Sequence, residues 1–550
     1  MRWLKDVRYA LRTFKNAPGF TATAILTLAL GIGATTAIFT LVHAVLLKSL
    51  PVVKPEELWR VAGNEESDVT RDLEGNWSRF SFEQYRLFKE NTTGFAELAA
   101  FQAGDNLIGV RRAGSSRPAE PFSGEYVSGN YFSTFGIKAY AGRTLTPPDD
   151  SKGAPAVAVI SFRTWQDRFG KDPSVLGAEF VINAQPVTII GVAPPGFFGD
   201  RIRPNPPSFW IPLADEPVIE PAYSLFNEPS WYWLGLTGRV VPGGNVKAIE
   251  AQMQLQLQRF LLSPQSKLEP RQRDLIPAQT LRLSPGGSGG QALRNEYQDG
   301  LRLLMLTSGF VLLIVCANLA NLMLVRATTH KRQTSVRVAL SASRHTLVRL
   351  ALTDSIVMAV MGGIIGIAIA FVGTRVILAL AFGNEYVPIH PTPSLPVFAF
   401  AFGASLLTGM LFGIAPAWIT ASTDPIEALS GANRSTRRSA EWGQKSLVVA
   451  QAALSLCLLC GAGLLIRSLN NTRHQSFGFE TANRYILHID PQMAGYKPDQ
   501  LQPLYHRLRD ILSSMPGIEQ VSFSLYSPME GGTWDETVFV EGQAPPLGCK

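Results

Sequence analysis

One serine has the sequence context of a hydrolase nucleophile. Gly286, Ser288 and Gly290 fit the G-x-S-x-G pattern, in which a strained turn exposes a serine for attack on an acyl group. That turn needs an apolar strand before it and a packed helix after it. The surrounding residues, SPGGSGGQ at 284–291, instead have the composition of a flexible joint, so we expect no catalytic serine.

Nucleotide and metal chemistry are also not indicated. The sequence has no GxxxxGK[ST] phosphate loop, and in RFGKDPS the residue after the lysine is Asp172 instead of a Mg²⁺-binding hydroxyl. The seven histidines show neither HExxH nor other ligand-pair spacing. We therefore expect a protein that is not an enzyme, with no catalytic residues, no metal site and no cofactor.

The strongest pattern is a recognition pattern. KRQTSVRVALSASRHTLVRL, residues 331–350, is basic and has no acidic residue. On a helical wheel its apolar residues share one arc, and Arg337, Ser341 and Arg344 follow one another on the neighbouring arc. Such a helix can lie on anionic lipid headgroups, or it can dock its apolar ridge in a groove of a soluble partner. These residues alone leave both alternatives open.

Long apolar runs surround this segment. The chain has 550 residues, 46% hydrophobic and 17% charged, which is too apolar for an ordinary soluble enzyme. About 20 helical residues cross a bilayer. We expect five transmembrane helices, at 21–47, 301–326, 350–381, 396–420 and 446–468. The first is too long for a signal peptide and lacks a convincing cleavage site, so we interpret it as an uncleaved anchor.

The positions of Lys and Arg predict the orientation of these helices. Basic residues precede the first run and lie between the second and third and between the fourth and fifth, whereas 382–396 has none. The positive-inside rule then places an amphipathic helix at 1–20, the segment 327–349 and a linker at 421–445 in the cytoplasm. Residues 48–300 and 469–550 are exported. The formal net charge of +7 follows from this bias, and we expect no nucleic-acid partner.

The exported segments have a mixed α/β pattern. Residues 55–63 and 95–102 predict strands on either side of a helix at 81–92. The same order returns in the tail, with a strand at 484–490, a helix at 499–515 and a strand at 517–525, which suggests an internal duplication.

Small residues in the spans predict close helix contacts. Gly362 with Gly366, and Gly409 with Gly413, form two GxxxG motifs.

The sequence resembles the MacB/FtsX-type permeases of ABC transporters, and within them the duplicated orphan permeases (ADOP subfamily), which join two such units in one chain. Residues 325–366, VRATTHKRQTSVRVALSASRHTLVRLALTDSIVMAVMGGIIG, are similar to the cytoplasmic pattern of the family. Residues 126–199 resemble its periplasmic core domain almost position by position. DPIEAL at 424–429 and the run at 447–469 resemble the end of one unit and the start of the next.

The resemblance implies an α-helical polytopic protein of the bacterial inner membrane, with about five spans. It implies a large α/β (α+β) periplasmic domain at 48–300 and a partial second copy at 469–550. A separate cytoplasmic ATPase dimer would push the helix at 327–349 and move the exported domains, and this implication favours partner docking over headgroup binding. By residue-by-residue carry-over, the coupling surface consists of Arg332, Val336, Arg337, Leu340, Ser343 and Arg344.

The resemblance also leaves alternatives open. Gln333 stands where the family commonly has an acidic residue, and Ser341 stands where it has glycine, so the coupling could be weakened or lost. We expect a permease of an efflux or mechanotransmission system, with a periplasmic adaptor or a second permease as further candidate partners. An FtsX-like regulator of cell-wall hydrolases and a membrane-anchored scaffold without ATPase coupling are the alternatives. A full duplicated permease would complete the second exported domain and add three more spans, so we expect a fragment, a frameshifted product or a working half-size variant.

Overall fold

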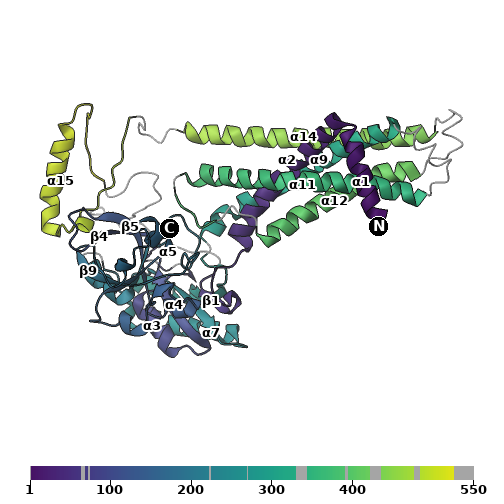
Figure 1. Cartoon of the computed structure of the whole chain (residues 1–550). Coiled ribbons are helices and arrows are strands. Elements are labelled where there is room, and N and C mark those ends of the chain that lie inside the picture. The colour runs from purple at the N-terminus through teal and green to yellow at the C-terminus, as the bar shows by residue number, and fades with distance from the viewer. Residues whose placement is uncertain are drawn as a thin grey trace.

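The structure has two parts, a bundle of long helices and an α/β domain. The computed structural model describes residues 2–63, 69–71, 73, 75–221, 224–268, 270–290, 292–329, 344–383, 385–389, 394–421, 435–475 and 483–524. Figure 1 shows the α/β domain at one end of the bundle and the N-terminal helix α1 (Arg2–Lys15) at the other end. The α/β domain is the segment between the long helices α2 (Pro18–Val42) and α9 (Ala292–Thr329).

The bundle consists of apolar helices. Besides α2 and α9, it contains α11 (Arg344–Phe382), α12 (Leu395–Ala421) and α14 (Ser435–Arg473). Among the residues that the structure describes, four segments are long and apolar enough to cross a membrane, namely Pro18–Leu47, Arg294–Met323, Leu352–Phe382 and Val448–Arg473. The predicted span at 396–420 lies in α12, whose side chains are described as far as Met410. The chain is therefore a polytopic membrane protein with a large α/β domain.

Helix α2 is at the centre of this bundle, because α9, α11 and α12 all pack against it. It ends in a single π-helical turn, η1 (His43–Leu47), before the chain enters the α/β domain. A π-turn leaves carbonyl groups without their usual helical donors. Arg294 of α9 supplies donors there, from Nε to the Val45 carbonyl at 2.7 Å and from a terminal nitrogen to the Lys48 carbonyl at 3.1 Å.

A mixed sheet of 11 strands organises the α/β domain. Strands β5, β10, β7, β9, β8 and β4 pair in that order, and β4 pairs again with β5, so these six strands close a ring. Strands β3, β11, β1 and β13 continue the sheet outward from β5. The strands are β1 (Leu58–Val61), β2 (Asn76–Trp77), β3 (Phe95–Gln102), β4 (Asn106–Arg112), β5 (Glu120–Val127), β6 (Ala141–Gly142), β7 (Val157–Ile160), β8 (Glu179–Ile182), β9 (Gln185–Val192), β10 (Phe209–Pro212), β11 (Leu234–Val240), β12 (Thr280–Leu281) and β13 (Leu283–Pro285).

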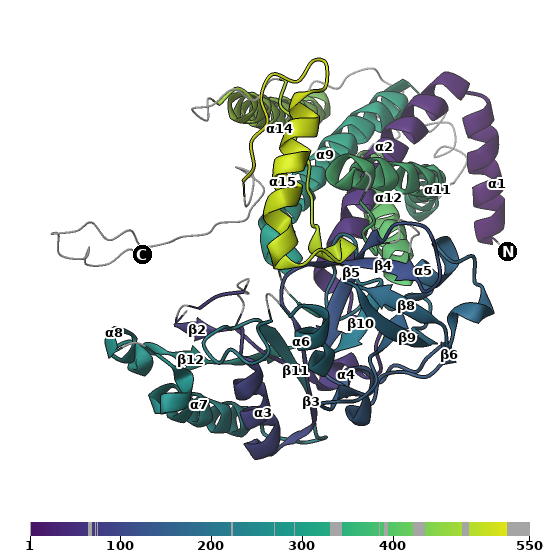
Figure 2. The same ribbon diagram turned by 90° about the vertical axis from the view of Figure 1, so that its left-hand side faces the viewer.

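Helices cover the outward part of this sheet. Figure 2 shows α3 (Phe82–Asn91) and α7 (Val246–Leu262) side by side next to β11. The predicted start of α3 is confirmed, because Ser81 and Gln84 form a capping box. The other helices of the domain are α4 (Tyr131–Phe135), α5 (Phe162–Asp167), α6 (Glu216–Ile219) and α8 (Pro270–Arg273), with short 3₁₀ turns η2 (Pro55–Glu57), η3 (Pro147–Asp150), η4 (Pro173–Val175), η5 (Leu213–Asp215), η6 (Pro264–Ser266) and η7 (Ile276–Ala278).

The predicted joint at 284–291 is not flexible over its described residues, 284–290. Ser284 and Pro285 belong to β13, which pairs with β1. The amide of Leu50 donates to the Gly287 carbonyl at 2.9 Å, and the amide of Gly290 donates to the Asp200 carbonyl at 3.0 Å. Glycine is needed at 289, where φ is +79° and a Cβ would lie 2.4 Å from the Asp200 carbonyl oxygen. The glycines here permit close backbone contact, and the prediction of a flexible linker is wrong.

The tail only partly follows its prediction. Helix α15 (Pro498–Ser513) forms where a helix is predicted, preceded by the turn η8 (Gln492–Ala494). The two predicted strands, at 484–490 and 517–525, are wrong over the described residues, which are not in strands. A strand requires a paired neighbour, and Tyr485 is 98% exposed. The tail instead contacts the α/β domain at η8, where Met493 lies against Gly109 of β4.

Candidate functional site

The predicted coupling surface lies outside the described residues. This applies to Arg332, Val336, Arg337, Leu340 and Ser343, and to the two departures, Gln333 and Ser341. Arg344 is the first residue of α11, but its side chain is not described. The structure does describe both flanks of the segment, since α9 ends at Thr329 and α11 begins at Arg344. In the sequence, residues 330–343 therefore connect the end of α9 to the start of α11.

Helix α1 is fixed to the start of α11 by an ion pair. Asp6 Oδ2 lies 2.9 Å from Arg349 Nε, with the two side chains 13% and 26% exposed. On its apolar side, α1 buries Ala10 and Phe14 in one cluster with residues of α2, α9 and α11. The sequence does not predict this pair, although Asp6 is the only acidic residue in the first 20 and marks α1 as a contact element.

Glycines bring α2 and α11 into backbone contact. A Cβ at Gly362 would lie 2.6 Å from Leu28 Cβ, and one at Gly366 would lie 3.2 Å from the Ala29 carbonyl oxygen. On the opposite helix, a Cβ at Gly33 would lie 2.9 Å from the Gly366 carbonyl oxygen. The contact thus depends on glycines of both helices. Gly33 was not predicted, because its partner glycine lies far away in the sequence.

The second predicted motif lies on α12. A Cβ at Gly409 would lie 3.1 Å from Ala359 Cβ of α11, so α12 also approaches α11 closely. The surroundings of Gly413 lie outside the described side chains.

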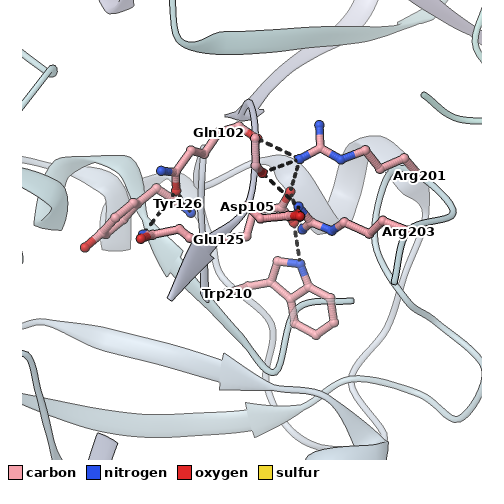
Figure 3. Close-up of polar contacts among 9 residues, drawn as sticks. Gln102, Asp105, Glu125, Tyr126, Arg201, Arg203 and Trp210 are labelled. Atoms are coloured by element: carbon pink, nitrogen blue, oxygen red, sulfur yellow. Dashed lines mark hydrogen bonds and ion pairs between the residues drawn. The ribbon is translucent and has the colours of Figure 1, made fainter. Parts of the chain in front are cut away.

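A buried charged cluster lies in the α/β domain, close to the bundle. Figure 3 shows Glu125 of β5 between the guanidinium groups of Arg203 and Arg201. Glu125 Oε1 is 3.0 Å from Arg203 and 3.9 Å from Arg201, and all three side chains are at most 8% exposed. Trp210 of β10 donates from Nε1 to Glu125 Oε2 at 3.0 Å. This carboxylate therefore joins two strands to one loop.

The same two arginines bind the turn after β3. Arg201 donates to the Gly104 carbonyl at 2.8 Å, and Arg203 donates to the same carbonyl at 3.0 Å. Arg203 also pairs with Asp105 Oδ1 at 3.2 Å. With buried charges, both partners must be present, since an unpaired charge inside a domain is costly.

Burial raises the pKa of Glu125 to about 8, even though Arg203 and Arg201 lower it. The neighbouring Asp200 carboxylate contributes to the rise. Such a shifted carboxyl often marks a catalytic site, but structural ion networks shift pKa values too. Since Glu125 is buried and its carboxyl oxygens contact arginine and tryptophan side chains, we assign it a structural role.

A cleft of about 350 Å³ is lined in part by the loop that carries Arg201 and Arg203. Its walls come from three places: α5, the loop 196–208, and the connection between α11 and α12. Arg163 of α5 stacks on the ring of Tyr386 in that connection, 3.6 Å from the ring centre. The α/β domain is thus in direct contact with the connection between two bundle helices.

Two segments of the chain each match the model of a protein family. Residues 21–255 match the family described as MacB-like periplasmic core domain, and residues 305–425 match the one described as FtsX-like permease C-terminal. These ranges contain the α/β ring of strands and the helices α11 and α12. The two matches lie in the order expected for one permease unit.

Curated relatives agree with these families. The pyoverdine export ATP-binding/permease protein PvdT of Pseudomonas syringae pv. tomato is 26% identical over 284 residues, covering 51% of this chain and 39% of the relative. The macrolide export ATP-binding/permease protein MacB of Marinobacter nauticus is 36% identical over 137 residues, 25% of this chain and 20% of the relative. The chain spans less than half the length of these relatives.

Among solved structures, the periplasmic region of MacB from Actinobacillus actinomycetemcomitans aligns with a TM-score of 0.30 and 12% identity, over 44% of this chain and 92% of that chain. From the two family matches and the curated relatives, the chain belongs to the MacB/FtsX-type permeases of ABC transporters.

Proposed function

We propose that this chain is the non-catalytic permease subunit of a MacB-like ABC exporter, which transmits the motion of a separate ATPase dimer to its α/β domain. In this proposal the N-terminus and the segment 327–349 are cytoplasmic, and the α/β domain lies in the periplasm of a bacterial inner membrane. The basic flanks described above support this orientation. The export function is supported by the names of the relatives, which are export ATP-binding/permease proteins.

The observation that carries the proposal is the continuity of α2 and α9. Each helix runs from the end of the bundle that holds α1 to the α/β domain. The coupling segment follows α9 directly and leads into α11, and α11 packs along α2. A displacement of the coupling segment would therefore reach helices that enter the α/β domain at both of its ends.

The six predicted coupling residues carry the contact with the ATPase in this proposal. An apolar ridge of Val336 and Leu340 beside Arg337 and Arg344 has the pattern of helix-in-groove recognition. The ion pair between Asp6 and Arg349 supports it, because it fixes the end of this segment against α1. Motion of the segment would then be passed to the bundle instead of being lost in a loose connection.

The test is co-purification of the chain with a cytoplasmic ATPase from membranes. We compare the native chain with an Arg337→Glu, Arg344→Glu double variant. The matched control is Lys138→Glu with Lys152→Glu, which reverses two exposed charges on the α/β domain. The proposal is supported if the native chain and the control variant both capture the ATPase and the Arg337→Glu, Arg344→Glu variant does not. If the native chain captures no ATPase, the scaffold alternative is favoured instead.

A further inference from the structure

One short stretch of the α/β domain enters the bundle. We name residues 200–205, Asp-Arg-Ile-Arg-Pro-Asn, the junction segment. Its Ile202 packs in an apolar cluster at the end of the bundle, around Leu41, Val45, Leu301 and Ile389. These residues come from α2, η1, α9 and the connection between α11 and α12. Of the cluster's described members, Ile202 alone comes from the folded part of the α/β domain.

The junction segment also binds the connection between α11 and α12 through its backbone. The amide of Asn205 donates to the Tyr386 carbonyl at 2.8 Å, and the amide of Tyr386 donates to Asn205 Oδ1 at 3.4 Å. Asn205 has φ +47°, a left-handed conformation that asparagine tolerates better than most residues. This connection is therefore held on two sides, by Asn205 and by the stacked Arg163.

The other side of the junction segment is fixed inside the domain. Arg201 and Arg203 flank Ile202, and both side chains reach Glu125 of β5. Asp200 accepts a hydrogen bond from Gly290, two residues before α9 begins at Ala292. Ile202 packs against the bundle, whereas the residues on either side of it bind inside the α/β domain. Adjacent residues of the junction segment therefore contact the two parts of the structure.

We propose that the junction segment couples displacement of the α11–α12 connection to the closed ring of strands in the α/β domain. This inference rests on the proposed function and deepens it. Helices α2 and α9 are linked covalently to the sheet, through β1 and β13. Helix α11 has no such link, so its movement reaches the ring through Ile202, Asn205 and the arginine pairs on Glu125. Ile202 and Asn205 are positioning residues in this scheme.

Hydrogen exchange of the full chain in lipid nanodiscs tests the inference without any ATPase. Ile389→Ala loosens the cluster on the bundle side. We expect it to raise the exchange of the β5 and β10 amides by about fivefold or more, because local opening controls the exchange rate. In an Ile202→Ala background, the same substitution should add less than about twofold, since the apolar contact through which Ile389 acts on the junction segment is already lost.

The matched control is Leu319→Ala, which removes the same volume from the opposite end of the bundle. Leu319→Ala should leave the hydrogen exchange of the β5 and β10 amides unchanged. Unchanged exchange with Ile389→Ala, or the same rise in both backgrounds, would overturn the inference. If an alanine variant does not fold, Ile389→Val and Ile202→Val provide the same comparison with a smaller effect.

The two proposals fail separately. If Ile389→Ala raises the hydrogen exchange of β5 and β10 but the native chain captures no ATPase, the inference about the junction segment stands and the transport proposal is rejected. If the chain captures an ATPase but Ile389→Ala leaves the hydrogen exchange of β5 and β10 unchanged, only the inference about the junction segment is rejected.

Discussion

Gly33 of α2 and Gly366 of α11 face each other with their backbones in contact, since a Cβ on Gly33 would lie 2.9 Å from the Gly366 carbonyl oxygen. The neighbouring atom is backbone and cannot rotate away. In a bundle without a strong hydrophobic drive between helices, such contacts supply much of the packing energy. The α2–α11 pair is therefore sensitive to small additions of volume.

Gly33→Ala should lower the stability of the folded bundle by about 1–3 kcal/mol, because the added methyl group overpacks this contact. The matched control is Gly461→Ala in α14, where no atom lies within 4 Å of the added Cβ among the described residues. There alanine should be neutral or stabilise by up to about 1 kcal/mol through its helix propensity. Thermal unfolding of the full chain in one detergent measures both. If Gly33→Ala leaves the stability unchanged, as Gly461→Ala is expected to do, the packing argument is wrong.

At pH 9, where Glu125 is ionised, Glu125→Gln should destabilise the α/β domain by about 3 kcal/mol, because it leaves two buried guanidinium groups without their carboxylate. Glu120→Gln is the control on the same strand. Glu120 pairs with Arg168 at 2.7 Å, but both side chains are about half exposed, so its loss should cost under about 1 kcal/mol. Chemical unfolding followed by tryptophan fluorescence measures the difference, and Trp210 reports directly on Glu125. A neutral Glu125→Gln would show that the cluster does not hold the junction.

The local elements were predictable because their signals are local. FAELAAFQ predicts a strand over 95–102, and β3 has these bounds. The helix at 81–92 was predictable from its apolar spacing, and Ser81 begins it as a capping residue should. The apolar runs predicted the bundle helices for the same reason, since length and composition decide whether a helix can span a bilayer.

The long-range contacts were not predictable. RYILHID has the composition of a strand, but its described residues are not assigned to a strand. Glu125 and Arg203 are separated by several strands, and no property of either residue marks the other as its partner. Likewise, the glycines around Ser288 predict flexibility until Leu50 and Asp200 are known to bind their backbone. Such pairings follow from the topology of the ring and cannot be inferred from local composition.

The α/β domain should lose stability as the pH rises from about 4.5 to about 7. Burial raises the pKa of Glu216 to about 7, although Ser224 and the Leu225 amide donate to its carboxylate. An acid whose pKa is higher in the folded state binds more protons there than in the unfolded state. Its contribution to stability is therefore full below the unfolded pKa of about 4.5 and is lost as the pH rises through about 7.

Glu216→Gln should flatten this decline between pH 5 and pH 8, by up to about 3 kcal/mol, because glutamine does not titrate. Glu228→Gln is the control, since Glu228 is an exposed partner of Lys267 and should leave the profile unchanged. Denaturant midpoints of the full chain at several pH values give both profiles. A decline that persists in Glu216→Gln would assign the pH dependence to other buried carboxyls, such as Glu125.

The ion pair between Asp6 and Arg349 gives the sharpest test of how α1 takes part in coupling. Both side chains are partly buried, so the pair should be worth about 1 kcal/mol, and Asp6→Asn should reduce ATPase capture severalfold without unfolding the chain. Asp299→Asn is the matched control, because both side chains of its pair with Arg302 are mostly exposed. The exchanged variant, Asp6→Arg with Arg349→Asp, restores the attraction and should recover the capture. If Asp6→Asn reduces the capture and the exchange does not restore it, the aspartate itself, and not its pairing with α11, contributes to the ATPase contact.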